Sequence, residues 1–427
     1  MELRSDKAWL AWLPLAAIYF FSVFPRVAAP TTTFNDLLAE FSCSGAAVAG
    51  LGAMYFYVYG LMQVPTGILA DAFGPKRVAV TGGFLIALGS IGFSQAPNLF
   101  LLYAARFFVA LGSGLVFISV LKSVDLHFPP ARFATLTAAT TAIGGAGALA
   151  ASVPFAYLVR STSWRTGIAL SGCACLAFCV LAAVFVTGKG AHAKHRPTQP
   201  LRHGIVAAFS NPRTYPPLLV NLGIFIQTYL LQGNIGSKFF EDRLGWSSVR
   251  ASQQVFLLTL GILAGVFSVG FLSDRVFRRR KPVILLFAIL GVPFWATIVL
   301  STLCPIPSVV LTISVLAIGL SNGCPPLNYA VAREVNNPRT AGLSMGIANT
   351  AGMVASAMAI NLSGFLLDWG GFTLASDGKT KVFSSCAYML VSALGFAAAI
   401  GASVAAFFVT ETGNMNVWQA HEEKRHD

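Results

Sequence analysis

Charged residues are scarce in this sequence, and no long polar stretch interrupts it. Only 11% of the 427 residues are Asp, Glu, Lys or Arg, whereas a soluble domain carries about 25%. Apolar segments recur from Trp9 to Thr410, with short polar joints between them. The composition therefore excludes a surface that faces mainly water. Because the first apolar segment lacks a small-residue cleavage site, we interpret it as a retained span.

Signatures of several other protein classes are also missing. No GxxxxGK[ST] motif occurs, which argues against ATP-driven transport by this chain. The sequence shows no nucleophile–base pair and no metal cluster. Cys173, Cys175 and Cys179 share one apolar segment without CxxC spacing, and we interpret them as small packing residues. We therefore expect neither an enzyme nor a bound cofactor or metal.

Deep acidic residues are absent as well. None of the 16 carboxylates falls near the middle of an apolar segment, and neither does any histidine. A cation-coupled site built on paired aspartates is therefore not expected. If transport is coupled to protons, the coupling would use a carboxylate at a span end or the substrate itself. Asp36 and Glu334 are the candidate carboxylates.

Twelve segments have the roughly 20 apolar residues that a membrane-spanning helix needs. The basic joint 188–213, which contains three prolines, separates them into two sets of six. The sequence thus predicts an N-terminal six-helix bundle (1–187), a cytoplasmic linker (188–213), and a C-terminal six-helix bundle with a cytoplasmic tail (214–427). The predicted spans are 9–38, 45–70, 78–97, 99–126, 131–158, 165–187, 214–238, 250–273, 282–303, 308–332, 340–367 and 383–410.

The positions of the basic residues predict the orientation. With both termini in the cytoplasm, 19 of the 29 Lys and Arg residues lie in cytoplasmic segments, 6 lie in outer loops and 4 lie inside spans. This bias follows the positive-inside rule, so the net charge of +13 does not indicate nucleic-acid binding. We expect a multi-pass protein of the inner or plasma membrane.

One loop sequence occurs twice. Residues 67–77 read GILADAFGPKR and residues 270–280 read GFLSDRVFRRR, so that Gly, Leu and Asp recur at the same offsets before a basic pair. The copies lie 203 residues apart, in equivalent joints of the two halves. Duplicated six-span units related by an axis along the membrane normal produce this pattern.

These loops resemble the signature loop of the major facilitator superfamily and its second-half copy, in which Phe277 replaces the expected glycine. Arg106 followed by Gly112 and Gly114, and Trp164-Arg165, are similar to further family patterns. The resemblance covers the whole chain. It implies an all-α membrane protein of twelve transmembrane helices in two pseudo-symmetric six-helix bundles that work by alternating access. It also implies a gating latch at the loops, formed by Asp71, Lys76, Arg77, Asp274, Arg279 and Arg280.

A finer similarity gives a lead on substrate class. Several stretches resemble transporters of intracellular bacteria that import amino acids or nucleosides and, more loosely, organic-anion symporters. These stretches are Tyr19-Phe20-Phe21 with Arg26, 55–65, 112–122 and Ala348-Asn349.

Four cations fall within predicted spans, where a charge costs about 2.5–3.5 kcal/mol. Arg26 follows Pro25 in the first span, and we predict that it anchors a substrate carboxylate or phosphate. The alternative is that the span ends near Pro30 and Arg26 reaches the outer interface. For Arg106, a coupling role and pairing with backbone carbonyls are equally open. Lys122 either extends a cationic path to the substrate or reaches the inner interface.

Neutral polar residues mark the predicted cavity. Tyr55, Tyr59 and Gln63 recur every four positions, so they share one face of the second span. Each of these polar side chains taken singly is more often a contact between helices than a ligand contact. The predicted substrate-binding set is Arg26, Tyr55, Tyr59, Gln63, Lys122, Gln227, Asn234, Asn322, Asn328 and Asn349.

The sequence therefore predicts a secondary transporter for a small polar metabolite that carries a carboxylate, such as an organic anion or amino acid. Nucleoside or sugar uptake, and drug or metabolite efflux by antiport, are the alternatives. The expected partners are a small-molecule substrate and membrane lipid, with a co-transported proton left open and nucleic acid excluded. We expect a monomer.

Overall fold

A computed structural model of the chain describes residues 5–128, 130–185, 210–337, 341–374, 380–413 and 415–418. Most of the predicted linker, 188–213, lies outside these ranges. The side chains of Asp71 and Asn234 also lie outside the described part of the structure.

The regular elements among the described residues of the first half are all helical. Its helix starts follow local sequence: the side chains of Ser44 and Asn98 cap the helices that follow them. The elements are α1 (Ser5–Val27), the π-helical turn η1 (Ala28–Thr32), α2 (Phe34–Phe41), α3 (Gly45–Phe73), α4 (Pro75–Gln95), α5 (Leu99–His127), α6 (Pro130–Ala150), α7 (Val153–Ser161) and α8 (Trp164–Phe185).

The second half repeats this organisation and adds a small hairpin. Strands β1 (Phe372–Leu374) and β2 (Lys381–Phe383) pair antiparallel. The helical elements are η2 (Pro212–Thr214), α10 (Tyr215–Leu230), η3 (Leu231–Ile235), α11 (Gly236–Leu244), α12 (Ser248–Phe271), η4 (Leu272–Val276), α13 (Lys281–Leu300), α14 (Ser308–Ser321), α15 (Pro325–Glu334), α16 (Ala341–Trp369) and α17 (Ser385–Phe407).

The span count agrees with the sequence. Within the described ranges, eleven helices are long and apolar enough to cross a membrane, or twelve if α10 and α11, bent by 59°, form one span. The first predicted span, 9–38, was too long: the spanning stretch ends at Thr32, and α2 is a separate short helix. The tenth is broken between Ser321 and Pro325, because Pro325 and Pro326 lack the N–H groups that a continuous helix needs.

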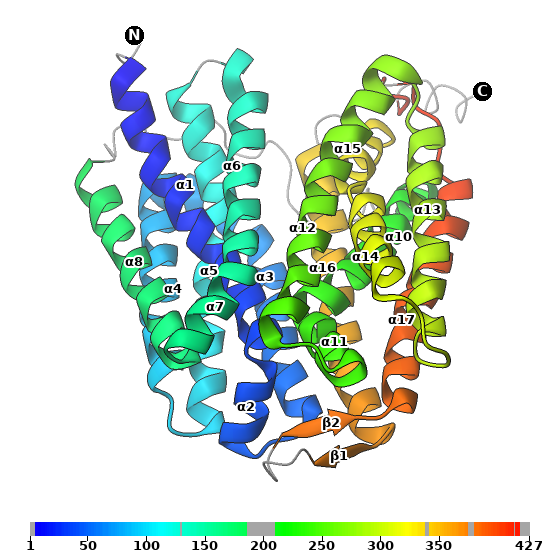
Figure 1. Cartoon of the computed structure of the whole chain (residues 1–427). Helices are drawn as coiled ribbons and strands as arrows, with labels where there is room; N and C mark the ends of the chain where they lie inside the picture. Colours follow the sequence, from blue (N-terminus) through cyan, green and yellow to red (C-terminus); the bar gives the residue numbers. More distant parts are fainter. Residues whose placement is uncertain are drawn as a thin grey trace.

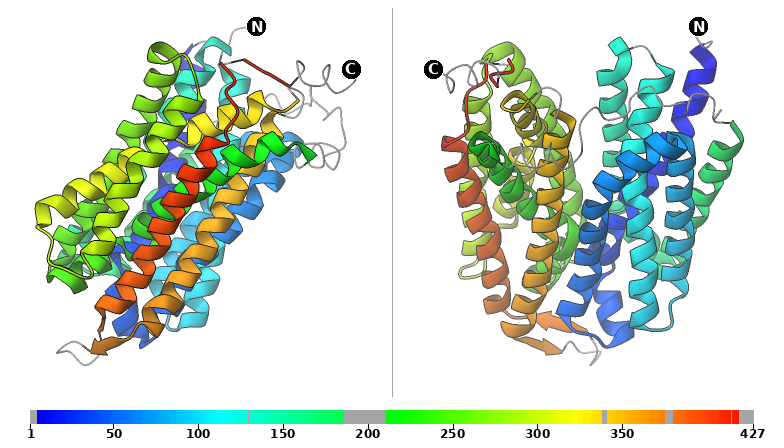
Figure 2. Two further views of the ribbon diagram at one scale, coloured as in Figure 1. Left: turned by 90° about the vertical axis from the view of Figure 1, so that its right-hand side faces the viewer. Right: turned by 180° about the vertical axis from the view of Figure 1, so that it is seen from behind.

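The helices form two bundles that stand side by side (Figures 1 and 2). We call the end where α1 begins and α17 finishes the termini end, and the end that carries β1 and β2 the hairpin end (Figure 1). Helices pack closely inside each bundle. A Cβ atom on Gly82 of α4 would lie 2.7 Å from the carbonyl oxygen of Gly112 on α5, so only glycine allows this approach.

The two bundles meet near the hairpin end and separate toward the termini end. Along α3, a Cβ on Gly45 would lie 2.8 Å from Phe383, and one on Gly60 would lie 3.1 Å from Met353 of α16. A Cβ on Gly67, two turns further toward the termini end, would meet none of the described residues within 4 Å, and the same holds for Gly346 of α16. The ribbons diverge in the same direction (Figure 2). The interface between the bundles is therefore closed at the hairpin end.

Candidate functional site

The first helix breaks where the bundles meet. Ala29 leaves helical geometry (φ −128°, ψ 120°), and Pro30 has no N–H to donate. Such a break frees backbone carbonyls, which need partners inside a membrane. Arg106 on α5 supplies them: its Nη1 donates to the carbonyl of Pro25 (2.8 Å), its Nη2 to that of Ala29 (2.5 Å) and its Nε to that of Leu51 (3.2 Å). The carbonyl-pairing interpretation of Arg106 is thus confirmed, and its coupling role stays a prediction.

Arg26 lies one turn before this break and faces the other bundle. Its Cζ lies 5.3 Å from the ring centroid of Tyr229 on α10. The residue is half-buried, and its buried Nε has no hydrogen-bond partner among the described residues. No ion pair or hydrogen bond to its other nitrogens occurs in that part of the chain either. Arg26 is therefore an uncompensated cation at the interface between the bundles.

Aromatic side chains surround this cation. The rings of Tyr55 and Tyr59 stack at 6.0 Å with an interplanar angle of 11°, which confirms that they share a face of the second span. Tyr55 donates its hydroxyl to the carbonyl of Ser22 (2.6 Å), and Phe56 packs 4.4 Å from Tyr229. Gln63 donates to the Tyr59 carbonyl one turn back (3.2 Å).

The second bundle holds three buried amides of the predicted substrate-binding set. Gln227, Asn322 and Asn328 are each at most 3% exposed. Among the described residues, no partner contacts Gln227 Oε1, Asn322 Nδ2 or either amide atom of Asn328. Such atoms cost free energy unless water or a ligand contacts them. Asn349 differs, because its Oδ1 accepts a hydrogen bond from Tyr329 (2.9 Å).

The first signature loop is tied to its own bundle. Lys122 donates from Nζ to the carbonyl of Gly67 (2.6 Å), at the end of α5 away from Arg106. Lys76 donates to the carbonyl of Ala183 (2.8 Å), and Arg77 is exposed. The structure therefore separates Lys122 from Arg26, and its role as a substrate ligand stays a prediction.

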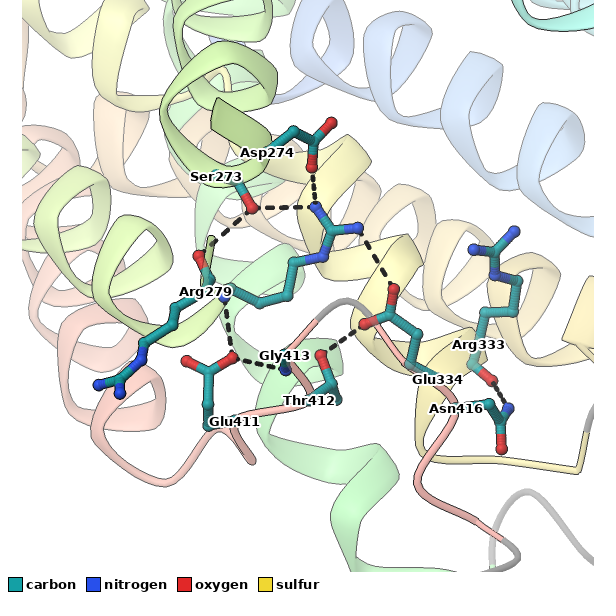
Figure 3. Close-up of polar contacts among 10 residues, drawn as sticks. Ser273, Asp274, Arg279, Arg333, Glu334, Glu411, Thr412, Gly413 and Asn416 are labelled. Carbon is teal, nitrogen blue, oxygen red and sulfur yellow. Dashed lines mark hydrogen bonds and ion pairs between the residues drawn. The ribbon is translucent and has the colours of Figure 1, made fainter. Parts of the chain in front are cut away.

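The second loop forms a polar network at the termini end (Figure 3). Arg280 pairs with Asp274 (2.7 Å) and with Glu334 at the end of α15 (3.3 Å). The hydroxyl of Thr412 donates to the other oxygen of Glu334 (2.5 Å). Arg279 is exposed. All these contacts lie within the second bundle, so in this conformation they do not join the two bundles, and the latch role stays a prediction.

The segment after α17 completes this network, and the sequence analysis missed it. The Glu411 carboxylate accepts the backbone N–H groups of Arg280 (3.0 Å) and Lys281 (3.1 Å) at the start of α13. Burial raises the pKa of Glu411, but hydrogen bonds from Gly413 and the α13 amides outweigh it and lower the pKa overall. An acidic residue just after the last span was the only signal available in the sequence.

Two contacts close the hairpin end. Asp368 of α16 accepts the N–H groups of Gly45 (2.9 Å) and Ala46 (2.7 Å), which are free donors at the start of α3. Thr31 donates to the carbonyl of Gln232 (2.7 Å). Both contacts cross between the bundles, and neither partner pair was evident in the sequence.

Comparison with known proteins identifies the family of this chain. A model described as Major Facilitator Superfamily matches residues 15–360. The chain is 25% identical to monocarboxylate transporter 13 of Bos taurus over 391 residues, which cover 87% of this chain and 86% of the relative. It is 23% identical to a gentisate transporter of Corynebacterium glutamicum, covering 85% and 82% of the two chains.

Solved structures share the fold. A bacterial homologue of the human lysosomal transporter Spinster, described as inward-facing and unoccupied, matches with a TM-score of 0.73 at 15% identity, over 95% of this chain and 97% of that one. A nucleoside transporter matches with a TM-score of 0.72 at 13% identity, over 92% and 99%. At these identities the likeness concerns the fold.

Proposed function

Because this chain belongs to the Major Facilitator Superfamily, we propose that it is a secondary transporter that carries a small carboxylate-bearing metabolite by alternating access. The substrate site lies between the bundles, around Arg26 and the aromatic residues that face it. Tyr229, Tyr55 and Tyr59 form its described wall. The buried amides Gln227, Asn322 and Asn328 are assigned to the polar part of the cargo.

The uncompensated charge of Arg26 carries this proposal. A guanidinium left without an anionic partner in a half-buried position gains most when an anion binds, because arginine forms two parallel charge-assisted hydrogen bonds with a carboxylate. The Cζ of Arg26 lies 5.3 Å from the Tyr229 ring centroid, a cation–π contact that uses none of the N–H donors of the guanidinium. The same arrangement disfavours a cationic drug.

The names of two relatives support an anionic cargo. Monocarboxylate transporter 13 and the gentisate transporter each match more than four fifths of this chain, and their named cargoes carry a carboxylate. The nucleoside transporter matches by fold alone, at 13% identity. We therefore place a carboxylate ahead of a nucleoside or sugar.

We also infer which side of the membrane the open end of the protein faces. The positive-inside bias puts the termini end in the cytoplasm. The conformation described above is then inward-facing, with the hairpin end closed. In this scheme the loop residues Asp71, Lys76, Arg77, Asp274, Arg279 and Arg280 join the bundles only when the hairpin end opens.

The test is uptake of monocarboxylates and gentisate into proteoliposomes, guided by a thermal-shift screen of the purified protein. Losing a charge-assisted hydrogen bond costs about 1.5–3 kcal/mol, so Arg26→Ala should lower affinity about 10- to 150-fold, with Arg26→Lys in between. Arg250→Ala is the matched control, because Arg250 also stacks on an aromatic ring (Trp246, 4.2 Å) but on the exposed side of α12. Unchanged uptake of every carboxylate by Arg26→Ala would refute the anchoring role.

A further inference from the structure

A polar cavity lies at the hairpin end, and Arg26 is not among its lining residues. Its volume is about 300 Å³, and both bundles line it: α2 and α7 from the first, α11 and α12 from the second. Its charged lining residues are Asp36, Arg160, Lys238 and Glu241. Because these elements meet only when the hairpin end is closed, the cavity belongs to the closed arrangement of that end.

Two carboxylates from opposite bundles face this cavity. Asp36 lies on α2 and Glu241 on α11, and both are partly buried. The Glu241 carboxylate accepts a hydrogen bond from Asn35, the residue next to Asp36, and the charges of Asp36 and Glu241 interact across the cavity that both line. Within the described residues neither forms an ion pair.

The neighbouring charges are already engaged or remote. On α11, Lys238 donates to Asp242 (2.6 Å) and to the carbonyl of Lys381 (2.6 Å), and Asp242 also accepts from Tyr388 (2.8 Å). On α2, Glu40 pairs with Arg165 (2.5 Å). On α7, Arg160 faces the cavity but is exposed to water, which screens its charge.

The local environment favours the protonated form of Asp36. Burial raises the pKa of Asp36 to about 6, its own backbone N–H opposes this, and the charge of Glu40 adds to it. An aspartate in water has a pKa of about 3.9. A proton therefore binds Asp36 more tightly when the hairpin end is closed than when that end is open to water.

We propose that Asp36 and Glu241 form a proton-binding site that closes the hairpin end. When both are ionised, two like charges face each other across the interface and oppose closure. A proton taken from water onto a carboxylate oxygen of the pair removes one charge and lets the bundles meet. Only the use of this proton-binding site in transport rests on the proposed function, because the proton-dependent closure itself needs no substrate.

The dependence of closure on pH has a definite sign. Since the Asp36 pKa is higher in the closed state, closure is most favoured below the open-state pKa of about 4 and loses this contribution as the pH rises through about 6. A difference of about two pKa units corresponds to as much as a 100-fold change in the ratio of closed to open molecules. Above pH 5, most of this change in the ratio of closed to open molecules would occur between pH 7 and pH 5.

The experiment measures closure without any substrate. The full chain, with its seven native cysteines replaced, carries spin labels at Gln95→Cys on α4 and Thr373→Cys on β1, which are both exposed and lie on opposite bundles. Distances are measured by electron–electron double resonance in lipid vesicles from pH 8 to pH 4. The short-distance population should grow as the pH falls, with its midpoint between the open-state pKa of about 4 and the closed-state pKa of about 6.

Matched variants decide the outcome. Asp36→Asn with Glu241→Gln mimics the protonated pair, so the short-distance population should dominate at every pH. Glu40→Gln removes a carboxylate one turn along α2, whose charge adds to the Asp36 pKa, so the pH response should persist with its midpoint at a somewhat lower pH. If the parent shows no pH response, or the double variant titrates like the parent, the proposal is overturned. If the double variant does not fold, Asp36→Asn alone must abolish or displace the midpoint between pH 4 and pH 6. Arg26→Ala should leave this pH response intact, so a failure of the substrate assignment can be distinguished from a failure of the proton-site proposal.

Discussion

Arg26 and Tyr229 face each other from equivalent positions of the two repeats. The guanidinium carbon lies 5.3 Å from the ring centroid. The two residues are 203 positions apart, the same spacing that separates Gly67 from Gly270 in the duplicated loop. A pseudo-twofold arrangement brings equivalent positions of the first span of each half together on the axis between the bundles. The repeat has therefore diverged here into a cation and the aromatic ring that orients it.

This relationship predicts how Tyr229 contributes to binding. A cation–π contact contributes about 0.5–2 kcal/mol, so Tyr229→Leu should weaken carboxylate binding about 2- to 30-fold. Tyr229→Phe keeps the ring and should bind nearly as well as the parent. Calorimetric titration with monocarboxylates and gentisate would measure the effect. If the Phe variant binds as weakly as the Leu variant, the hydroxyl and not the ring is responsible.

Arg106 should matter for stability more than for ligand binding. Arg106→Gln removes donors from the carbonyls of Pro25, Ala29 and Leu51, and each unsatisfied buried group costs about 1–3 kcal/mol. The melting temperature in detergent should fall by several degrees with or without ligand. Arg106→Lys should recover part of the loss. A variant with unchanged melting temperature but slower transport would instead support the coupling role.

Asp368 should hold the hairpin end closed. Its carboxylate accepts two N–H groups at the start of α3, where a negative charge is stabilised by about 0.3–1 kcal/mol, and up to about 2 kcal/mol when partly buried. Asp368→Asn keeps the size and removes the charge. In a cysteine-free background with Thr31→Cys, the rate of alkylation by a membrane-impermeant reagent should rise about 2- to 30-fold. An unchanged rate would show that this cap does not govern opening.

Glu334 should act as a structural residue of the termini end. It is 3% exposed and pairs with both Arg280 and Thr412, and breaking a buried ion pair costs about 3–5 kcal/mol. Glu334→Gln should lower the melting temperature. Thr412→Val should lower it less, and the two changes should not be additive. The pH response of the hairpin end should persist in both variants. Its loss in Glu334→Gln would favour the proton-coupling role that the sequence suggested.

The sequence predicted the membrane fold because bilayer physics is local. A span needs a run of apolar residues, and the duplicated loop marks the repeat directly, so the helices and the two-bundle architecture followed from the chain alone. The stacking of Tyr55 on Tyr59 followed from helical periodicity. The break at Pro325 followed from the missing N–H of proline.

The partners of individual side chains required the tertiary structure, because they come from elements distant in sequence. Arg26 and Arg106 are both arginines inside predicted spans, yet Arg106 binds three backbone carbonyls, whereas Arg26 lies against aromatic rings, with its Cζ 5.3 Å from the Tyr229 centroid. Asp36 was one of two candidate carboxylates at span ends, and only the tertiary structure places it at one cavity with Glu241 of the other bundle. Hydropathy and charge counts fix how each helix sits in the bilayer, whereas helix packing decides which buried charge is satisfied and which is left for a ligand.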